Sequence, residues 1–335
     1  MSAQNQHYVP RFILRNFLFD REKEQVAVYD KHDDRIFQTS IKNIMAEREF
    51  HDFSFEEFIV SFESVISRIE DAVLPVYNKV VAERRLTNTP EEKALLAFLI
   101  AFQFVRTKSH RDLAKGLEED LAKHLESMGQ SIENIEGWKP STENDEKQGH
   151  LRDIRKNVGE FAKMIALKDF LLSKPSEGRS FYLGDTPVCL SNQRDFGPYG
   201  NIGLMVPGIE IYLPLASDLM LCAWCPTVLA GFREALAAHQ RMPLAEVLAG
   251  RMPAAEMKAF LDRTRPRVQP LERLLKHANE GTPLDSSPDN MDYYNSLQMR
   301  CAARYVISAD GDFDLAQRHN KEFPHLRRGY RPTIS

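Results

Sequence analysis

The chain has 335 residues, of which 43% are hydrophobic and 27% charged, a composition typical of a globular protein with a sizeable core. Its 44 basic and 48 acidic residues leave a net charge of −4, which excludes a generally basic nucleic-acid-binding surface but allows a local basic groove. Four cysteines make no disulfide framework, the first residues do not resemble a signal peptide, and no apolar run reaches the roughly 18 residues of a membrane span, so we expect a cytoplasmic protein without a membrane partner.

The first elements are predicted to be short strands around a short helix. Residues 7–19 are dense in aromatic and aliphatic side chains, which water disfavours, so we expect a packed strand followed by a helix over 10–17 rather than a frayed end. Alternating β-rich residues at 25–30 and 35–39, separated by a polar turn, predict a β-hairpin. Residues 49–53 predict one more strand.

Helical spacing dominates the middle of the chain. An apolar stripe predicts a helix over 54–84, which Pro75 is expected to kink or break. Thr89, Pro90 and Glu92 predict an N-cap, a first helical residue and a capping box for the helix that continues to residue 107. Two further helices are expected over 111–128 and 147–172, separated by a polar loop.

The second half of the chain mixes strands and helices. Strands are predicted at 181–183, 188–190, 210–214, 219–224 and 304–308, and helices within 226–280 and over 289–303. The fold class is therefore α+β, with a central helical bundle flanked by a small N-terminal β-hairpin and a C-terminal antiparallel sheet. We expect residues 1–175 to hold the hairpin and bundle, and residues 176–335 to form a strand-bearing region packed with them as one unit.

The N-terminal segment holds the strongest candidate for chemistry. Arg11 and Arg15 stand four residues apart, on one face of the predicted helix, where two guanidinium groups can hold a phosphate or carboxylate. His7 titrates near neutral pH and suits a general acid or base. The alternative is a helix docked by its aromatic side chains, with solvated arginines and a histidine that is satisfied by local hydrogen bonds.

A second candidate lies in the turn Gly184-Asp-Thr-Pro187, between two predicted strands. Asp185 at a strand end is placed where sites are often built, and it is a candidate to ligate a divalent metal ion or to orient His7. The alternative is an ordinary β-turn, in which glycine, aspartate and proline serve the backbone.

Two more polar patches lie on predicted helices. Gln103 and Arg106 end an otherwise apolar helix, facing a cavity or a carboxylate such as Glu63 or Glu70; the alternative is a structural ion pair near a helix C-terminus. Asn295 is a candidate to hydrogen bond a ligand, or else a local cap.

Several common sites find no support in the sequence. The chain has no P-loop, no GxGxxG after a strand, no HExxH and no GxSxG motif. Cys222 and Cys225 form a CxxC without a second pair for zinc, late in a predicted strand, so we interpret them as core thiols.

Residues 6–17, QHYVPRFILRNF, resemble the opening signature of a bacterial family known as domain of unknown function 4238. The resemblance continues in order through QFVRT at 103–107 and the turn at Asp185 to RYVI at 304–307. In the family the turn usually reads Ser-Asp-Asn-Pro, so Gly184 and Thr186 depart from it here. The resemblance implies no particular activity, but it concentrates on the four polar patches and so favours one composite site.

These patches together suggest a phosphodiester hydrolase of the nuclease kind. In this hypothesis His7 is the general acid or base, Asp185 orients it or binds a divalent metal, and a set of polar side chains holds the anionic substrate: Arg11, Gln103, Arg106 and Asn295. The partner would be a nucleic acid or nucleotide. The alternative is a non-catalytic module that senses a nucleotide or another anion, in a bacterial defence or toxin system. A third possibility is a structural protein whose N-terminal aromatic residues form a dimer interface.

Overall fold

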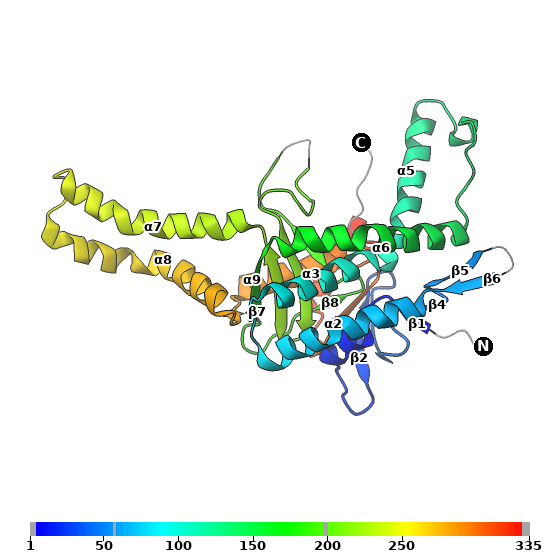
Figure 1. Ribbon diagram of the computed structural model, residues 1–335, viewed down its shortest axis with the longest axis horizontal. Helices are drawn as coiled ribbons and strands as arrows, with labels where there is room; N and C mark the ends of the chain where they lie inside the picture. Colours follow the sequence, from blue (N-terminus) through cyan, green and yellow to red (C-terminus); the bar gives the residue numbers. More distant parts are fainter. Residues whose placement is uncertain (1–4, 56–57, 197–199, 330–335) are drawn as a thin grey trace.

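The computed structural model describes residues 5–55, 58–196 and 200–329, and within them the chain is an α+β protein, as predicted. Helices and two larger sheets form a central body (Figure 1). Two projections leave that body: a long hairpin of α7 (Pro226–Leu248) and α8 (Met257–Glu280), and the separate helix α5 (Leu113–Ser127). None of the described helices is both long and apolar enough to cross a membrane.

The larger sheet has five strands, all from the second half of the chain. Their order is β12 (Leu284–Asp285), β7 (Asp169–Lys174), β11 (Leu219–Trp224), β10 (Glu210–Ala216) and β9 (Cys189–Ser191). β12 is parallel to β7, and the other neighbours are antiparallel. Every residue of β10 is buried, which is typical of a strand covered on both faces.

The second sheet brings the two ends of the chain together. It has the order β3 (Arg35–Ser40), β2 (Gln25–Asp30), β13 (Tyr305–Ser308) and β8 (Leu183–Gly184). The predicted hairpin is β2–β3, and β13 pairs with β2 along its whole length, from Tyr305 opposite Asp30 to Ser308 opposite Ala27. The expectation of an N-terminal hairpin that is separate from the C-terminal sheet is therefore corrected, because a late strand completes the early one.

Two small two-stranded sheets complete the described strands. β1 (Asn5–His7) pairs with β4 (Ala46–Arg48), and β5 (Asp52–Phe55) pairs with β6 (Phe58–Ser61). The predicted helix over 54–84 begins only at Glu63. Phe58 and Ile59, which continue the apolar spacing of that helix in the sequence, lie on β6 with 70% and 72% of their surface exposed.

Four helices cover the sheets: α2 (Glu63–Glu83), α3 (Pro90–Val105), α6 (Glu143–Ala166) and α9 (Pro288–Cys301). α3 packs against both α2 and α6, and most of its residues are buried. The predicted N-cap is confirmed, since the Thr89 hydroxyl accepts from the Glu92 backbone N–H at 3.2 Å. The predicted capping box is not closed, because the Glu92 carboxylate accepts from the backbone N–H groups of Thr87 and Asn88 instead. α2 continues through Pro75 without a break, and α6 ends at Ala166, so most of the apolar run expected to finish that helix belongs to β7.

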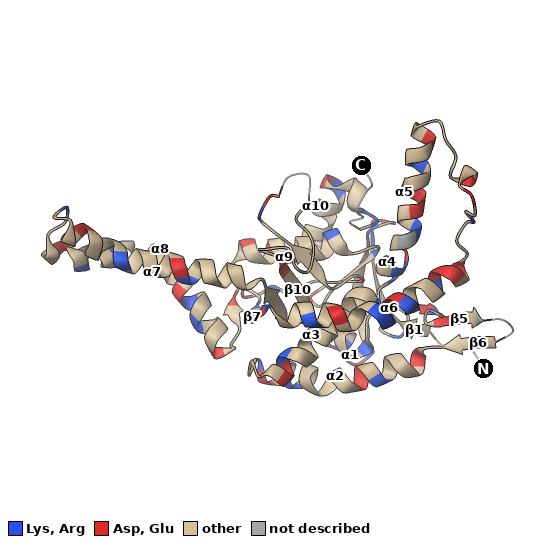
Figure 2. Cartoon of the chain, turned by 45° about the horizontal axis from the view of Figure 1, so that its top comes forward, with Lys and Arg blue, Asp and Glu red and all other residues tan. Residues whose placement is uncertain are grey.

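The N-terminal segment is packed into the core, as its composition predicts. Tyr8, Val9, Ile13, Leu14 and Phe17 are all buried. Within the described residues the remaining short helices are α1 (Arg11–Leu14), η1 (Arg15–Phe17), α4 (Lys108–Arg111), η2 (Ile132–Asn134), η4 (Ala254–Glu256), α10 (Asp314–Glu322) and η5 (Pro324–Leu326). Charged residues of both signs are spread over the projecting helices (Figure 2).

His150 on α6 predicts how stability changes with acid. Its ring Nε2 donates to the Val105 carbonyl at 2.6 Å, and burial lowers the pKa of His150 from 6.5 to about 3. A histidine with a depressed pKa contributes stability above about pH 6.5 that is lost as pH falls toward its folded pKa, because the unfolded chain binds the proton first. We expect this group to remove about 2–3 kcal/mol of unfolding free energy between pH 7.5 and pH 4.5.

Urea unfolding of the wild type and of His150→Gln at both pH values measures this effect. Glutamine can still donate to the Val105 carbonyl but does not titrate. The unfolding free energy of His150→Gln should therefore fall less than that of the wild type between the two pH values, by about 2–3 kcal/mol. The same loss in both proteins would show that His150 is protonated as easily in the folded state as in the unfolded chain.

Candidate functional site

A cavity of about 610 Å³ lies beside the N-terminal segment, and we call it the signature cavity. β1, α1, the turn after β3, β4, α2 and the end of α3 each contribute to its wall. Its lining consists of Asn5, His7, Arg11, Phe12, Arg15, Lys42, Asn43, Arg48, Glu63, Ser67, Glu70, Asp71, Leu74 and Arg106. Five of these are basic and three acidic, so the lining carries a net charge of +2 when His7 is neutral.

His7 lies at the end of β1 with a fixed ring orientation. Its Nε2 is 2.8 Å from the Ile41 carbonyl oxygen, which can only accept, so Nε2 donates and Nδ1 keeps its lone pair. Burial lowers the pKa of His7, and Arg11 and Arg106 lower it further, although the Ile41 bond works in the opposite direction. The ring is therefore neutral at pH 7 and available as a proton acceptor.

Arg106 connects two walls of the signature cavity, because it binds both Glu70 on α2 and the His7 carbonyl on β1. Its side chain is 1% exposed, with Nη1 donating to Glu70 Oε1 at 2.6 Å and Nη2 to the His7 carbonyl at 2.5 Å. Its guanidinium also lies 4.8 Å from the centre of the Phe102 ring. Of the two expected partners, Glu63 and Glu70, the structure selects Glu70.

Gln103, one turn before Arg106 on α3, also binds the N-terminal segment. Its Nε2 donates to the Tyr8 carbonyl at 3.0 Å. Gln103 is not among the described residues that line the signature cavity. Gln103 and Arg106 thus bind consecutive backbone carbonyls of the N-terminal segment. The expectation that Gln103 holds substrate is corrected: it is fully buried and anchors β1 to α3.

One neighbouring pair was missed by the sequence analysis. His51 is fully buried, and its Nδ1 lies 2.9 Å from Glu63 Oε2 at the edge of the cavity. The hydrogen bond from His51 lowers the pKa of Glu63, while burial lowers the pKa of His51. Gln6 supports the pair by accepting from the His51 backbone N–H at 2.5 Å. The signals in the sequence were Glu63, named above as a possible partner of Arg106, and Gln6, which directly precedes His7.

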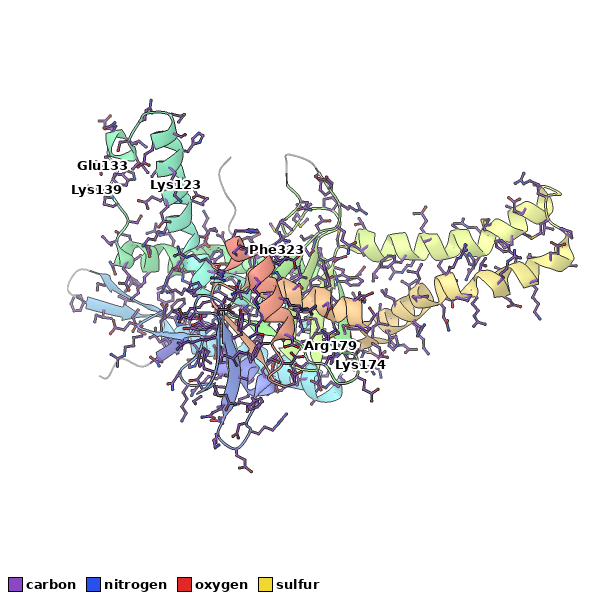
Figure 3. All side chains as sticks on the ribbon, turned by 180° about the vertical axis from the view of Figure 1, so that it is seen from behind. Lys123, Glu133, Lys139, Lys174, Arg179 and Phe323 are labelled. Carbon is purple, nitrogen blue, oxygen red and sulfur yellow. The ribbon has the colours of Figure 1, made fainter. Side chains whose placement is uncertain are left out.

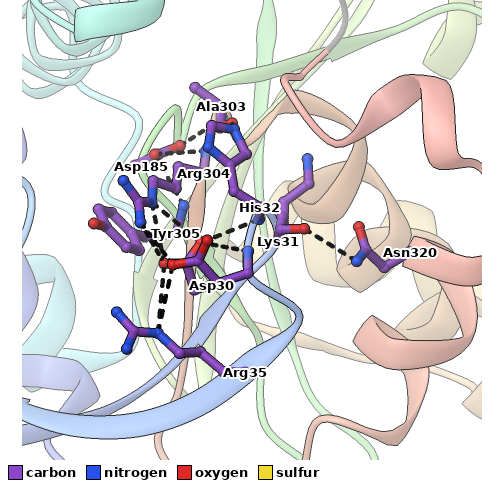
Figure 4. A network of polar contacts seen from close by, with 10 residues as sticks. Asp30, Lys31, His32, Arg35, Asp185, Ala303, Arg304, Tyr305 and Asn320 are labelled. Carbon is purple, nitrogen blue, oxygen red and sulfur yellow. Dashed lines mark hydrogen bonds and ion pairs between the residues drawn. The ribbon is translucent and has the colours of Figure 1, made fainter.

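Asp185 lies outside the signature cavity, in the polar network of Figure 4. Its two oxygens accept the backbone N–H groups of Ala303, Arg304 and Tyr305 at 2.7, 2.9 and 3.0 Å. Burial raises the pKa of Asp185, although these bonds and the buried Lys31 work against the rise. The expectation that Asp185 orients His7 is corrected, because its carboxylate instead fixes the chain where it enters β13.

Asn295 on α9 also binds backbone. Its Oδ1 accepts from the Tyr182 N–H at 2.8 Å, and its Nδ2 donates to the Ser180 carbonyl at 3.0 Å. Gln298, one turn later, bonds Gly184 N–H at 2.8 Å and the Pro187 carbonyl at 3.0 Å. Asn295 therefore holds the strand–turn segment onto α9, away from the signature cavity, which corrects its assignment to the same site.

The structure thus brings together His7, Arg11 and Arg106, and leaves Gln103, Asp185 and Asn295 elsewhere. In the described part of the chain, no group of three His, Cys, Asp or Glu side chains is arranged to hold a metal ion. The chemistry that the cavity does offer is a neutral histidine beside several guanidinium groups.

A comparison with protein families decides the affiliation. The family described as "Protein of unknown function (DUF4238)" matches residues 5–312. The chain belongs to the DUF4238 family. Its DUF4238 match covers the signature cavity, the Asp185 turn and Asn295, and it stops before α10. No curated protein and no solved structure was found to match the chain.

Proposed function

We propose that the signature cavity binds the phosphate groups of a small ligand or nucleotide, which is the non-catalytic alternative of the sequence analysis. The observation that carries this proposal is a set of three basic side chains at the cavity: Arg11, Lys42 and Arg48. All three are exposed, and none has an ion-pair partner among the described residues. Glu70, in contrast, is already neutralised by Arg106.

Unpaired guanidinium groups around a cavity suit phosphate because each can donate two parallel N–H bonds to its oxygens. The Arg106–Glu70 pair also lines the signature cavity, but its two charges neutralise each other and leave the anion to the unpaired basic side chains. The chain's overall charge of −4 favours a small or locally held anion over a long nucleic acid. A phosphorylated small molecule is therefore the partner that fits best.

A second candidate function is phosphodiester hydrolysis, and one observation favours it. The Nδ1 lone pair of His7 is left free by the bond from Nε2 to Ile41, and the lowered pKa keeps the ring a base at pH 7. In this proposal Arg11 and Arg48 hold the ester while His7 takes a proton from an attacking water. The water oxygen bonds to phosphorus as the ester P–O bond breaks, and the His7 imidazolium returns the proton to the departing oxygen. Asp185 has no part in it, because its oxygens are engaged by backbone N–H groups.

Titration calorimetry with inorganic pyrophosphate tests the binding proposal. We expect Arg11→Gln and Arg48→Gln each to raise the Kd about tenfold, which is the loss of one charge-assisted contact. The matched control is Arg155→Gln, since Arg155 is also an exposed arginine but lies on α6 away from the cavity. Equal affinity in all four proteins would place any binding elsewhere.

A further variant, His7→Gln, separates the two functions. A chromogenic phosphodiester, bis(4-nitrophenyl) phosphate, is incubated with the wild type and with His7→Gln, which retains a donor for the Ile41 carbonyl. The hydrolase proposal expects turnover in the wild type and its loss in His7→Gln at an unchanged melting temperature. Pyrophosphate binding without turnover supports the sensor alone.

A further inference from the structure

A second and larger cavity, of about 880 Å³, lies between α9 and the segment from α10 onward, and we call it the α9–α10 cavity. It shares no residue with the signature cavity. Tyr293 and Arg300 line it from α9, and His319, Phe323 and Arg328 line it from the other side. The DUF4238 match stops at residue 312, so that second wall lies beyond the matched segment.

The charge of this cavity is of one sign. Two arginines and two histidines, His319 and His325, line it, and no acidic residue does so within the described chain. Burial, together with the nearby charges of Lys31, Arg300 and His325, lowers the pKa of His319 to about 4, and the contribution of these charges reports a positive local field. Such a field favours an anion.

The remaining wall is apolar and aromatic. The Phe323 ring has its centre 4.9 Å from that of His319 and 6.2 Å from that of His325. Figure 3 places Phe323 at the end of α10, where 36% of its surface is exposed. Tyr293 faces the same cavity from α9, with its hydroxyl held by Ser191 at 2.6 Å. Flat rings at a pocket wall stack well on an aromatic ligand.

We infer that the α9–α10 cavity binds a small anion that carries an aromatic ring, the chemistry of a nucleoside monophosphate. The ring stacks on Phe323, beside His319, and the phosphate is held by Arg328 and Arg300. The cavity volume is ample for one such molecule, since pockets for ligands of this size span about 300–1,000 Å³. The site is independent of the signature cavity, whose lining is mainly polar and charged.

Titration calorimetry with AMP tests the inference, in the Arg11→Gln/Arg48→Gln background so that the signature cavity contributes little. We expect AMP to bind, and adenosine and ribose 5-phosphate each to bind about tenfold more weakly or worse, since each lacks one of the two recognised groups. Phe323→Ala should weaken AMP and adenosine about tenfold and leave ribose 5-phosphate unchanged. Arg328→Ala should weaken AMP and ribose 5-phosphate and leave adenosine unchanged.

The matched control is Arg318→Ala, because Arg318 is an exposed arginine on α10 that lines a different cavity. Its AMP affinity should equal that of the background protein. AMP affinities that are the same in Phe323→Ala, Arg328→Ala and the background would overturn the inference, as would a folded background protein that binds no AMP at millimolar concentration. Neither result bears on the pyrophosphate titration, so the two proposals fail separately.

Discussion

Replacing Asp185 with alanine is expected to lower the free energy of unfolding by about 3–5 kcal/mol, one of the largest effects of any single change in this chain. The carboxylate accepts three backbone N–H groups at the start of β13, and their loss leaves buried donors unsatisfied. The buried Lys31 also loses a neighbouring negative charge. Chemical denaturation of the purified protein measures the change.

Two further variants make this result specific. Asp185→Asn retains one carbonyl-type oxygen and should lose less stability than alanine, because part of the backbone bonding survives. Asp262→Ala, at an exposed aspartate on α8, should change stability by no more than about 0.5 kcal/mol. A stable Asp185→Ala protein that no longer binds or turns over ligand would restore Asp185 to a functional site.

Arg106→Ala should be similarly destabilising, by about 3–5 kcal/mol, because it leaves a carboxylate without its charge partner and a carbonyl without its donor. The acceptors in question are Glu70 and the His7 carbonyl, and both lie at the signature cavity. Arg106→Lys should be at best partly more stable than Arg106→Ala, since one ammonium group does not reproduce the two separate guanidinium bonds to Glu70 and the His7 carbonyl. Urea unfolding gives the free energies.

The control for Arg106 is Arg152→Ala, an exposed arginine on α6, which should unfold like the wild type. Glu70→Gln should cost less than Arg106→Ala, because Glu70 is 28% exposed and glutamine can still accept one bond. If Arg106→Ala unfolds at the wild-type urea concentration, the buried pair does not hold the N-terminal segment on α3.

Local signals in the sequence predicted most of the elements correctly. Thr89, Pro90 and Glu92 place a helix start because a cap depends only on neighbours three residues apart. The β2–β3 hairpin follows in the same way from its alternation and turn. The pairing of β13 with β2 joins opposite ends of the chain, and no local pattern encodes that contact.

The wrong boundaries have a common physical origin. Phe58 and Ile59 continue the apolar spacing of α2, yet they lie exposed on a hairpin. The apolar residues from 170 to 172 extend the pattern of α6 and instead form β7. Short apolar runs satisfy helix and strand templates alike, and packing against distant strands decides between them.

The sequence predicted three residues that line the candidate site, His7, Arg11 and Arg106. His7 and Arg11 belong to one short segment, and the helix that carries Arg106 packs directly on it through Gln103 and Arg106. Asp185 and Asn295 have side chains equally suited to chemistry, but they bind backbone groups of β8, β13 and the turns beside them. Residue type alone does not separate a catalytic carboxylate from one that caps a turn.

A crystal grown with tungstate, a heavy analogue of phosphate, would test the central claim most directly. Its anomalous signal locates the anion without prior assumptions. We predict a peak in the signature cavity within hydrogen-bonding distance of Arg11 and Arg48, with Arg106 still bound to Glu70 and to the His7 carbonyl. A signature cavity without tungstate, in a crystal that leaves it open to solvent, would contradict the claim that it is a phosphate-binding site.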